Sequence, residues 1–190
     1  MANLNTNVIT GEVRLSYVHL LEPYAMEQGQ KEKYSTTILI PKHDTATKAA
    51  IDAAIEAAAQ KGINGSWNGV RPKNVPNPLH DGDGVRESGE PYGDECKGHW
   101  VLTASSIQKP DVVNKSMYPL SSSDEVYSGM YARVFLNFYP YAASGRKGVA
   151  AGLGPVQKIQ DGEVLGGAPA KASDVFSAVE IDPITGKPIL

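Results

Sequence analysis

Apolar and polar residues alternate most regularly in the stretch 129–158. Within it, every second residue from 132 to 138 is apolar, as in a β-strand that turns one face to a core. A turn of sequence SGRKG at 144–148 and a second apolar stretch at 149–156 follow, so we expect a β-hairpin with a basic tip. The other face of the first strand carries a guanidinium, an amide and three aromatic rings: Arg133, Phe135, Asn137, Tyr139 and Tyr141.

This second face has an unusual composition, because a solvated sheet would carry Thr, Lys or Glu there. Aromatic rings beside cations on an open strand face are typical of surfaces that bind a single nucleic-acid strand, since bases stack on rings and phosphates need counter-charges. Aromatic residues in strands are more often packing residues, so burial in a core or under a second sheet is the alternative that periodicity alone favours. The pattern leaves both interpretations open.

Three further segments have the pattern of strands. The segment 8–20 alternates, and Val13 and Tyr17 fall together on its apolar face. The segment 34–40 is rich in β-branched residues and is followed by a proline, which cannot continue the ladder of a central strand. The segment 98–106 alternates again. These strands precede the hairpin in the chain.

One helix is predicted between the second and third of these strands. The segment 46–61 is rich in alanine, the best helix former, and Asp44 or Thr45 can cap its N-terminus. Gly62 is expected to end it. A single helix inserted after two strands fits a small, mostly β barrel with a helical cap.

Two long segments, 62–94 and 107–129, lack regular patterning. The first contains seven glycines and four prolines, and we expect an irregular loop with one short turn of helix. Long loops inside a compact domain are often functional. Trp67 in the first segment could stack on a base beside neighbouring cations, or it could anchor the loop to the core. The cations of interest in the two segments are Arg71, Lys73, Lys109 and Lys115.

The length of 190 residues suits one domain, which we place at 1–160, followed by a mobile, mildly acidic tail at 161–190. The chain has a net charge of −3. The tail holds two basic and five acidic side chains, so the body is near neutral and can still carry a local basic groove.

The cellular compartment follows from what the sequence contains. A single cysteine, Cys96, excludes an internal disulfide framework and fits a reducing compartment. No run of about 18 apolar residues could span a membrane, and the first residues lack the basic and apolar regions of a signal peptide. We therefore expect a cytoplasmic protein without a membrane partner.

Candidate catalytic groups are few. The sequence HDGDG at 80–84 offers an imidazole and two carboxylates that could hold Mg²⁺ in a nuclease, although Asp-Gly-Asp is also common in turns. Cys96 and His99 have a ligand-like spacing but no second pair of ligands. The glycines at 145–154 lack the Gly-Lys-Ser/Thr of a Walker loop, and no serine lies in a nucleophile elbow. We expect no enzymatic activity, no cofactor and no metal site.

Several ordered blocks of sequence resemble a known family. They are NFYPY at 137–141, GRKGVAAGLGPVQKIQDGEVLGG at 145–167, ASSIQKPDVVN at 104–114 and SDEVYSGMYARV at 123–134. Together they resemble phage and prophage single-stranded DNA-binding proteins, a family long catalogued as a domain of unknown function and similar to the OB-fold replication proteins of T-odd coliphages. The resemblance extends over roughly residues 8 to 177 and implies an OB-like five-stranded β-barrel.

The resemblance also implies a function: binding of single-stranded DNA without strong sequence preference, in phage DNA replication, recombination or repair, in the cytoplasm of a bacterial host. Expected partners are single-stranded DNA, phage replication or recombination proteins, and a second copy of the chain in a homodimer. The residues that we expect to contact DNA are Arg133, Phe135, Tyr139, Tyr141, Arg146, Lys147, Trp67, Arg71, Lys73, Lys109 and Lys115.

Two other functions remain open. A phage structural or adaptor protein could use the same aromatic face as a protein interface, because such interfaces are also enriched in aromatic residues and arginine. A metal-dependent nuclease could be built on the Asp-Gly-Asp turn. The sequence does not decide between these functions by chemistry alone.

Overall fold

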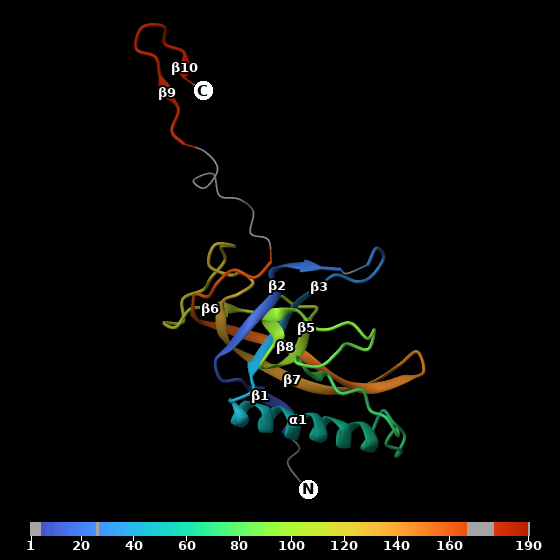
Figure 1. Ribbon diagram of the computed structural model, residues 1–190. Coiled ribbons are helices and arrows are strands. Elements are labelled where there is room, and N and C mark those ends of the chain that lie inside the picture. Colours follow the sequence, from blue (N-terminus) through green and yellow to red (C-terminus); the bar gives the residue numbers. More distant parts are fainter. Residues whose placement is uncertain (1–4, 26, 167–176, 190) are drawn as a thin grey trace.

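Five strands close on one another in a ring (Figure 1). The computed structural model describes residues 5–25, 27–166 and 177–189. Around the ring, β7 pairs with β2, β2 with β3, β3 with β5, β5 with β8, and β8 again with β7. All of these pairs are antiparallel except β5 with β8. The strands are β2 (Val13–Tyr24), β3 (Lys33–Pro41), β5 (His99–Ser106), β7 (Tyr131–Ala143) and β8 (Arg146–Gln160).

This arrangement confirms the expected mostly β, OB-like five-stranded barrel with one inserted helix. Three short strands extend the sheet: β1 beside β7, β4 beside β5 and β6 beside β8. A separate hairpin near the C-terminus pairs β9 with β10. The bounds of these elements are β1 (Asn7–Ile9), β4 (Leu79–Asp81), β6 (Val112–Val113), β9 (Glu180–Ile181) and β10 (Pro188–Ile189).

The inner face of the barrel follows the predicted alternation. Ala132, Val134, Leu136 and Phe138 of β7 are all buried, with exposed fractions of 0 to 1%. The hairpin turn is tighter than expected, because Ser144 and Gly145 alone connect β7 to β8. Both residues have positive φ, as the two central residues of a type I′ turn require. The basic residues of the expected tip therefore lie inside β8.

The helix α1 (Thr45–Asn64) closes one end of the barrel and packs against β1, β7 and β8. Asp44 caps it, accepting a 3.0 Å hydrogen bond from the backbone N–H of Thr47. The hydroxyl of Thr47 in turn accepts from the N–H of Gly11, 2.9 Å away, in the turn that divides the expected first strand into β1 and β2. Among the described residues, no helix is long and apolar enough to cross a membrane.

The helix ends later than predicted, and the reason is packing. Gly62 lies inside α1, and a Cβ atom there would be 2.6 Å from the Trp67 ring. The glycine is therefore needed for close approach of the tryptophan, and the cap is Gly65. The loop after the helix is irregular as expected, although it contains the unpredicted strand β4, and a short 3₁₀ helix, η1 (Asp94–Cys96), begins at the last residue of the segment.

The beginning of the expected tail packs against the barrel. The Arg14 guanidinium donates to the backbone oxygen of Glu163 at 2.7 Å. The backbone N–H of Leu165 donates to the backbone oxygen of Ser128 at 2.8 Å. Residues 167–176 lie outside the described residues, so the mobility that we expect of the tail stays a prediction. The hairpin of β9 and β10 was not predicted.

Candidate nucleic-acid interface

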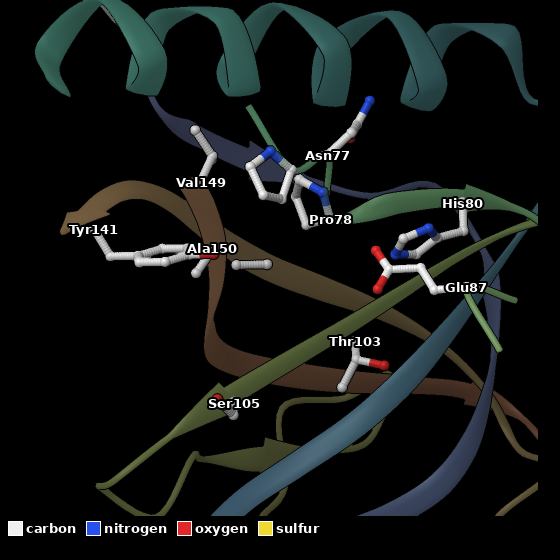
Figure 2. A pocket seen from close by; sticks show the side chains of 11 residues that line it. Asn77, Pro78, His80, Glu87, Thr103, Ser105, Tyr141, Val149 and Ala150 are labelled. Carbon is white, nitrogen blue, oxygen red and sulfur yellow. The ribbon is translucent and has the colours of Figure 1, made fainter. Parts of the chain in front are cut away.

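Two adjoining hollows cross the outer face of the barrel. The first, of about 330 Å³, lies over β5 and β8, and the second, of about 660 Å³, lies over β2, β3 and β5. His80, Glu87 and Thr103 line both hollows, which therefore adjoin, and we refer to the two together as the groove. Figure 2 shows the first hollow, with Tyr141 on one side, the His80 and Glu87 side chains directed toward each other on the other side, and Thr103 and Ser105 below.

Short hydroxylated side chains form the floor of the groove. Ser35 lies directly opposite Ser105, and Thr37 opposite Thr103, in the pairing of β3 with β5. The hydroxyl oxygens of the two threonines are 3.2 Å apart. A hydroxyl both donates and accepts hydrogen bonds, so such a floor can meet the edge of any base. The small side chains also leave the groove open.

Aromatic rings of β7 lie across glycines of β8 at one side of the groove. Tyr141 is paired with Gly148, and a Cβ atom on this glycine would be 2.6 Å from the tyrosine hydroxyl. The Tyr139 ring lies over Gly152, where an added Cβ atom would be 3.5 Å from the ring, an ordinary van der Waals distance. Since these glycines carry no side chain, the rings can lie along the sheet with one side open. Tyr139 is 41% exposed.

The predicted DNA-contacting residues are only partly brought together. Tyr139, Tyr141, Arg146 and Lys147 meet on the end of the β7–β8 hairpin, at residues 139–147, which we term the hairpin arm. Of the residues predicted to contact DNA, Tyr141 is the one that lines the groove. The Lys147 ammonium group donates to the backbone oxygen of Trp67 at 3.2 Å.

Trp67 does not offer a ring to a base. Its side chain is completely buried, and its indole N–H donates to the backbone oxygen of Tyr141 at 3.0 Å. The expectation of a stacking platform at this position is therefore wrong, and the alternative of a loop anchor holds. The physical reason is that the ring fills the space left by Gly62 of the helix.

The remaining predicted residues lie outside the groove lining. Arg71 forms two hydrogen bonds, of 2.6 and 2.8 Å, to the Glu56 carboxylate on α1, which raises the pKa of Arg71 and lowers that of Glu56. The Arg133 guanidinium donates to the backbone oxygen of Thr10 at 3.3 Å. Contacts of DNA with these residues stay predictions, as do those with Phe135 further along β7, Lys73, Lys109 and Lys115.

Several groove residues were missed. Tyr17, His19 and Tyr24 of β2 line the second hollow, together with Arg86 and Tyr92 of the long loop. The sequence places Tyr17 on the apolar face of its strand, but the residue is 61% exposed. A register shift after Ser16 and a positive φ at Tyr17 turn the ring outward, and alternation cannot anticipate such a bulge.

The two carboxylates of the HDGDG turn form ion pairs with one lysine. The Lys42 ammonium group lies 2.6 Å from an oxygen of Asp81 and 2.6 Å from an oxygen of Asp83. Hydrogen bonds from Lys42 lower the pKa of both carboxyl groups and in return raise the pKa of Lys42. Among the residues that the structure describes, no group of three potential metal ligands is found. Cys96 is buried, and this burial raises the pKa of its thiol.

Comparison with known proteins decides the family. The family model described as Enterobacter phage Enc34, ssDNA-binding protein, matches residues 6–183. The chain belongs to this family. The resemblance seen in the sequence is thereby confirmed over nearly the whole length.

Two phage proteins are similar to this chain over most of their length. A protein called p50 from Acyrthosiphon pisum secondary endosymbiont phage 1 is 33% identical over 172 residues, which cover 86% of this chain and 89% of p50. The structure of the single-stranded DNA-binding protein from bacteriophage Enc34 in complex with ssDNA is 32% identical, with a TM-score of 0.72 over 85% of this chain and 90% of that chain.

A more distant structure shares the fold. The single-stranded DNA-binding protein gp2.5 of bacteriophage T7 has a TM-score of 0.58 over 90% of this chain and 94% of that chain, at 13% identity. At this identity the likeness supports the barrel architecture alone.

Proposed function

We propose that the chain binds single-stranded DNA in the groove, with little sequence preference, during phage DNA replication, recombination or repair in the host cytoplasm, and that it does not catalyse a reaction on the DNA. The observation that carries this proposal is the position of the groove over β3 and β5, the second and third strands of the barrel. OB-folds bind oligonucleotides on this face. The family match supports the same function.

The groove has the groups that a single strand needs. A base stacked on an aromatic ring contributes about 1–3 kcal/mol, and Tyr139 and Tyr141 offer rings beside the floor. Arg86, Arg146 and Lys147 lie in the long loop and the hairpin arm and can neutralise phosphates.

Two carboxylates, Glu87 and Glu95, also line the groove. They disfavour phosphates at their positions, because like charges repel. We therefore expect the strand to place its bases on the hydroxyl floor and its phosphates toward the rim. A duplex keeps its bases paired inside the helix, so its bases cannot reach this floor.

Fluorescence anisotropy with a labelled oligonucleotide tests the proposal. The single strand should bind more tightly than its duplex, and the logarithm of the association constant should fall with the logarithm of salt concentration by about 0.7 per phosphate neutralised. The strand should stay intact when Mg²⁺ is added. Absence of binding would favour the protein-interface alternative, and Mg²⁺-dependent cleavage would favour a nuclease.

A further inference from the structure

The end of the groove opposite the hairpin arm contains a second set of aromatic rings. The His19 and Tyr24 rings are stacked, with centroids 4.4 Å apart and an angle of 9° between their planes. Tyr24 is 50% exposed, and the exposed Tyr17 lines the same hollow. A stacked pair with an open outer face is a platform on which a third flat ring can lie.

Tyr17 is held in a backbone conformation that tyrosine rarely adopts. Its φ is 47°, in the left-handed region, at the point where the pairing of β2 with β3 changes register. Such conformations persist only where the surrounding structure maintains them, and they are concentrated at binding sites. Bulges of this kind redirect a side chain. Here the bulge takes the ring out of the core and into the groove.

The two aromatic ends are joined by one row of paired residues across the barrel. His19 is paired with Ser35, Ser35 with Ser105, and Ser105 with Gly152, over which the Tyr139 ring lies. The row spans three strand-to-strand steps, about 14 Å at the usual strand spacing. A chain that crosses the strands along this row would meet rings at both ends and hydroxyl groups between them.

The ligand that fits this row is a nucleic-acid strand, and the inference rests on the function proposed above. We propose that Tyr17, His19 and Tyr24 form a second base-stacking subsite, so that one strand of DNA stacks bases at both ends of the groove. Two cations lie near this end of the groove and can meet phosphates. Lys33 of β3 lies opposite Tyr24 in the pairing of β3 with β2. The Arg86 guanidinium lies 5.2 Å from the centre of the Tyr92 ring, and both residues line the same hollow. Burial lowers the pKa of His19, which favours its neutral imidazole.

Two variants separate a binding role from a structural one. Tyr17→Asn removes the ring but keeps a residue that adopts the left-handed conformation readily. If Tyr17 serves binding, this variant should melt no lower than the wild type while its affinity for DNA falls. Tyr24→Ala removes the outer ring of the stacked pair. Tyr118→Ala is the matched control, because Tyr118 is 69% exposed and lies outside the groove lining.

The measurement is the affinity for oligothymidylates of increasing length, from about 4 to about 16 nucleotides, the range of OB-fold site sizes. Affinity of the wild type and of Tyr118→Ala should rise once an oligonucleotide spans both ends of the groove. In Tyr17→Asn and in Tyr24→Ala this rise should shrink by about 5- to 150-fold, the equivalent of one lost stacking contact.

The outcomes distinguish the subsite from the proposed function. If the wild type binds but both variants match Tyr118→Ala at every length, the subsite is disproved while the function stands. A lower melting temperature of Tyr17→Asn with unchanged affinity would likewise overturn the subsite and show that the ring serves folding. If the wild type binds no oligonucleotide, the proposed function itself fails.

Discussion

The two faces of β7 carry similar rings in opposite environments. On the inner face, Phe138 is surrounded by the core and is 1% exposed. On the outer face, its neighbour Tyr139 lies over Gly152 of the next strand and has one side open. The ring type therefore does not decide the role of an aromatic residue in this barrel. The role depends on whether the side of the ring that faces away from the sheet contacts other side chains or solvent.

Two glycines of β8 make room for other outer rings of β7. Side chains at Gly148 or Gly154 would collide with the rings of Tyr141 and Phe135, since added Cβ atoms would lie 2.6 Å from each. Rings that rest on glycine bury one side at the sheet and keep the other side for a ligand. Three substitutions and one truncation test these assignments, and the largest effect is expected inside the barrel.

Phe138→Ala should lower the free energy of unfolding by about 3–5 kcal/mol, because a large buried ring is lost and a cavity is left. The folded fraction should keep its affinity for single-stranded DNA. Urea unfolding combined with DNA titration under folding conditions measures both quantities. A small loss of stability together with a large loss of affinity would mean that the two faces are assigned the wrong way round.

Tyr139→Ala should weaken binding of single-stranded DNA by about 1–3 kcal/mol, because one stacked base loses its ring. Its melting temperature should stay close to that of the wild type, since the ring is 41% exposed. Anisotropy titration and thermal unfolding of the same samples provide the test. Tyr139→Phe is the matched control and should retain affinity, because stacking needs the ring and not the hydroxyl. Equal affinity of Tyr139→Ala and wild type would contradict the stacking role.

Gly148→Ala should weaken DNA binding by about 1 kcal/mol, at the lower end of the contribution of one stacked base. The added methyl group displaces the Tyr141 ring, whose hydroxyl would lie 2.6 Å from the new carbon atom. The control is a double-mutant cycle: in a Tyr141→Ala background the same substitution has no ring to displace and should change affinity little. Additive effects of the two substitutions would show that the glycine acts independently of the ring.

The smallest effect is expected at the C-terminus. Removal of residues 172–190 deletes Asp174, Glu180 and Asp182 against one lysine, Lys187. A tethered acidic segment competes with DNA for the cations of the groove, so the shortened chain should bind slightly more tightly, most visibly at low salt. Titrations at two salt concentrations, with light scattering to follow assembly, test this. Unchanged affinity at low salt, or an altered oligomeric state, would show that the segment has another role.

Elements that depend on local patterns could be predicted from the amino-acid sequence. The alternation of β7 identified its inner face, and the hairpin of β7 and β8 followed from two apolar stretches around a turn. The alanine-rich segment identified α1 and left two candidates for its cap, Asp44 and Thr45, of which the structure has Asp44. Each of these features depends on residues close together in the chain. Side-chain period and capping chemistry are therefore sufficient to predict them.

Tertiary structure decided which of the outward-facing rings are available to a ligand. Trp67 is buried because a helix glycine, distant from the hairpin in the sequence but beside it in the fold, leaves space for its ring. Tyr17 is exposed because a bulge interrupts β2. The groove itself exists only after β5 pairs with β8, which brings Ser105 beside Gly152. Alternation tells which residues share a face, but the groups that cover that face come from distant parts of the chain, and only closure of the barrel brings them together.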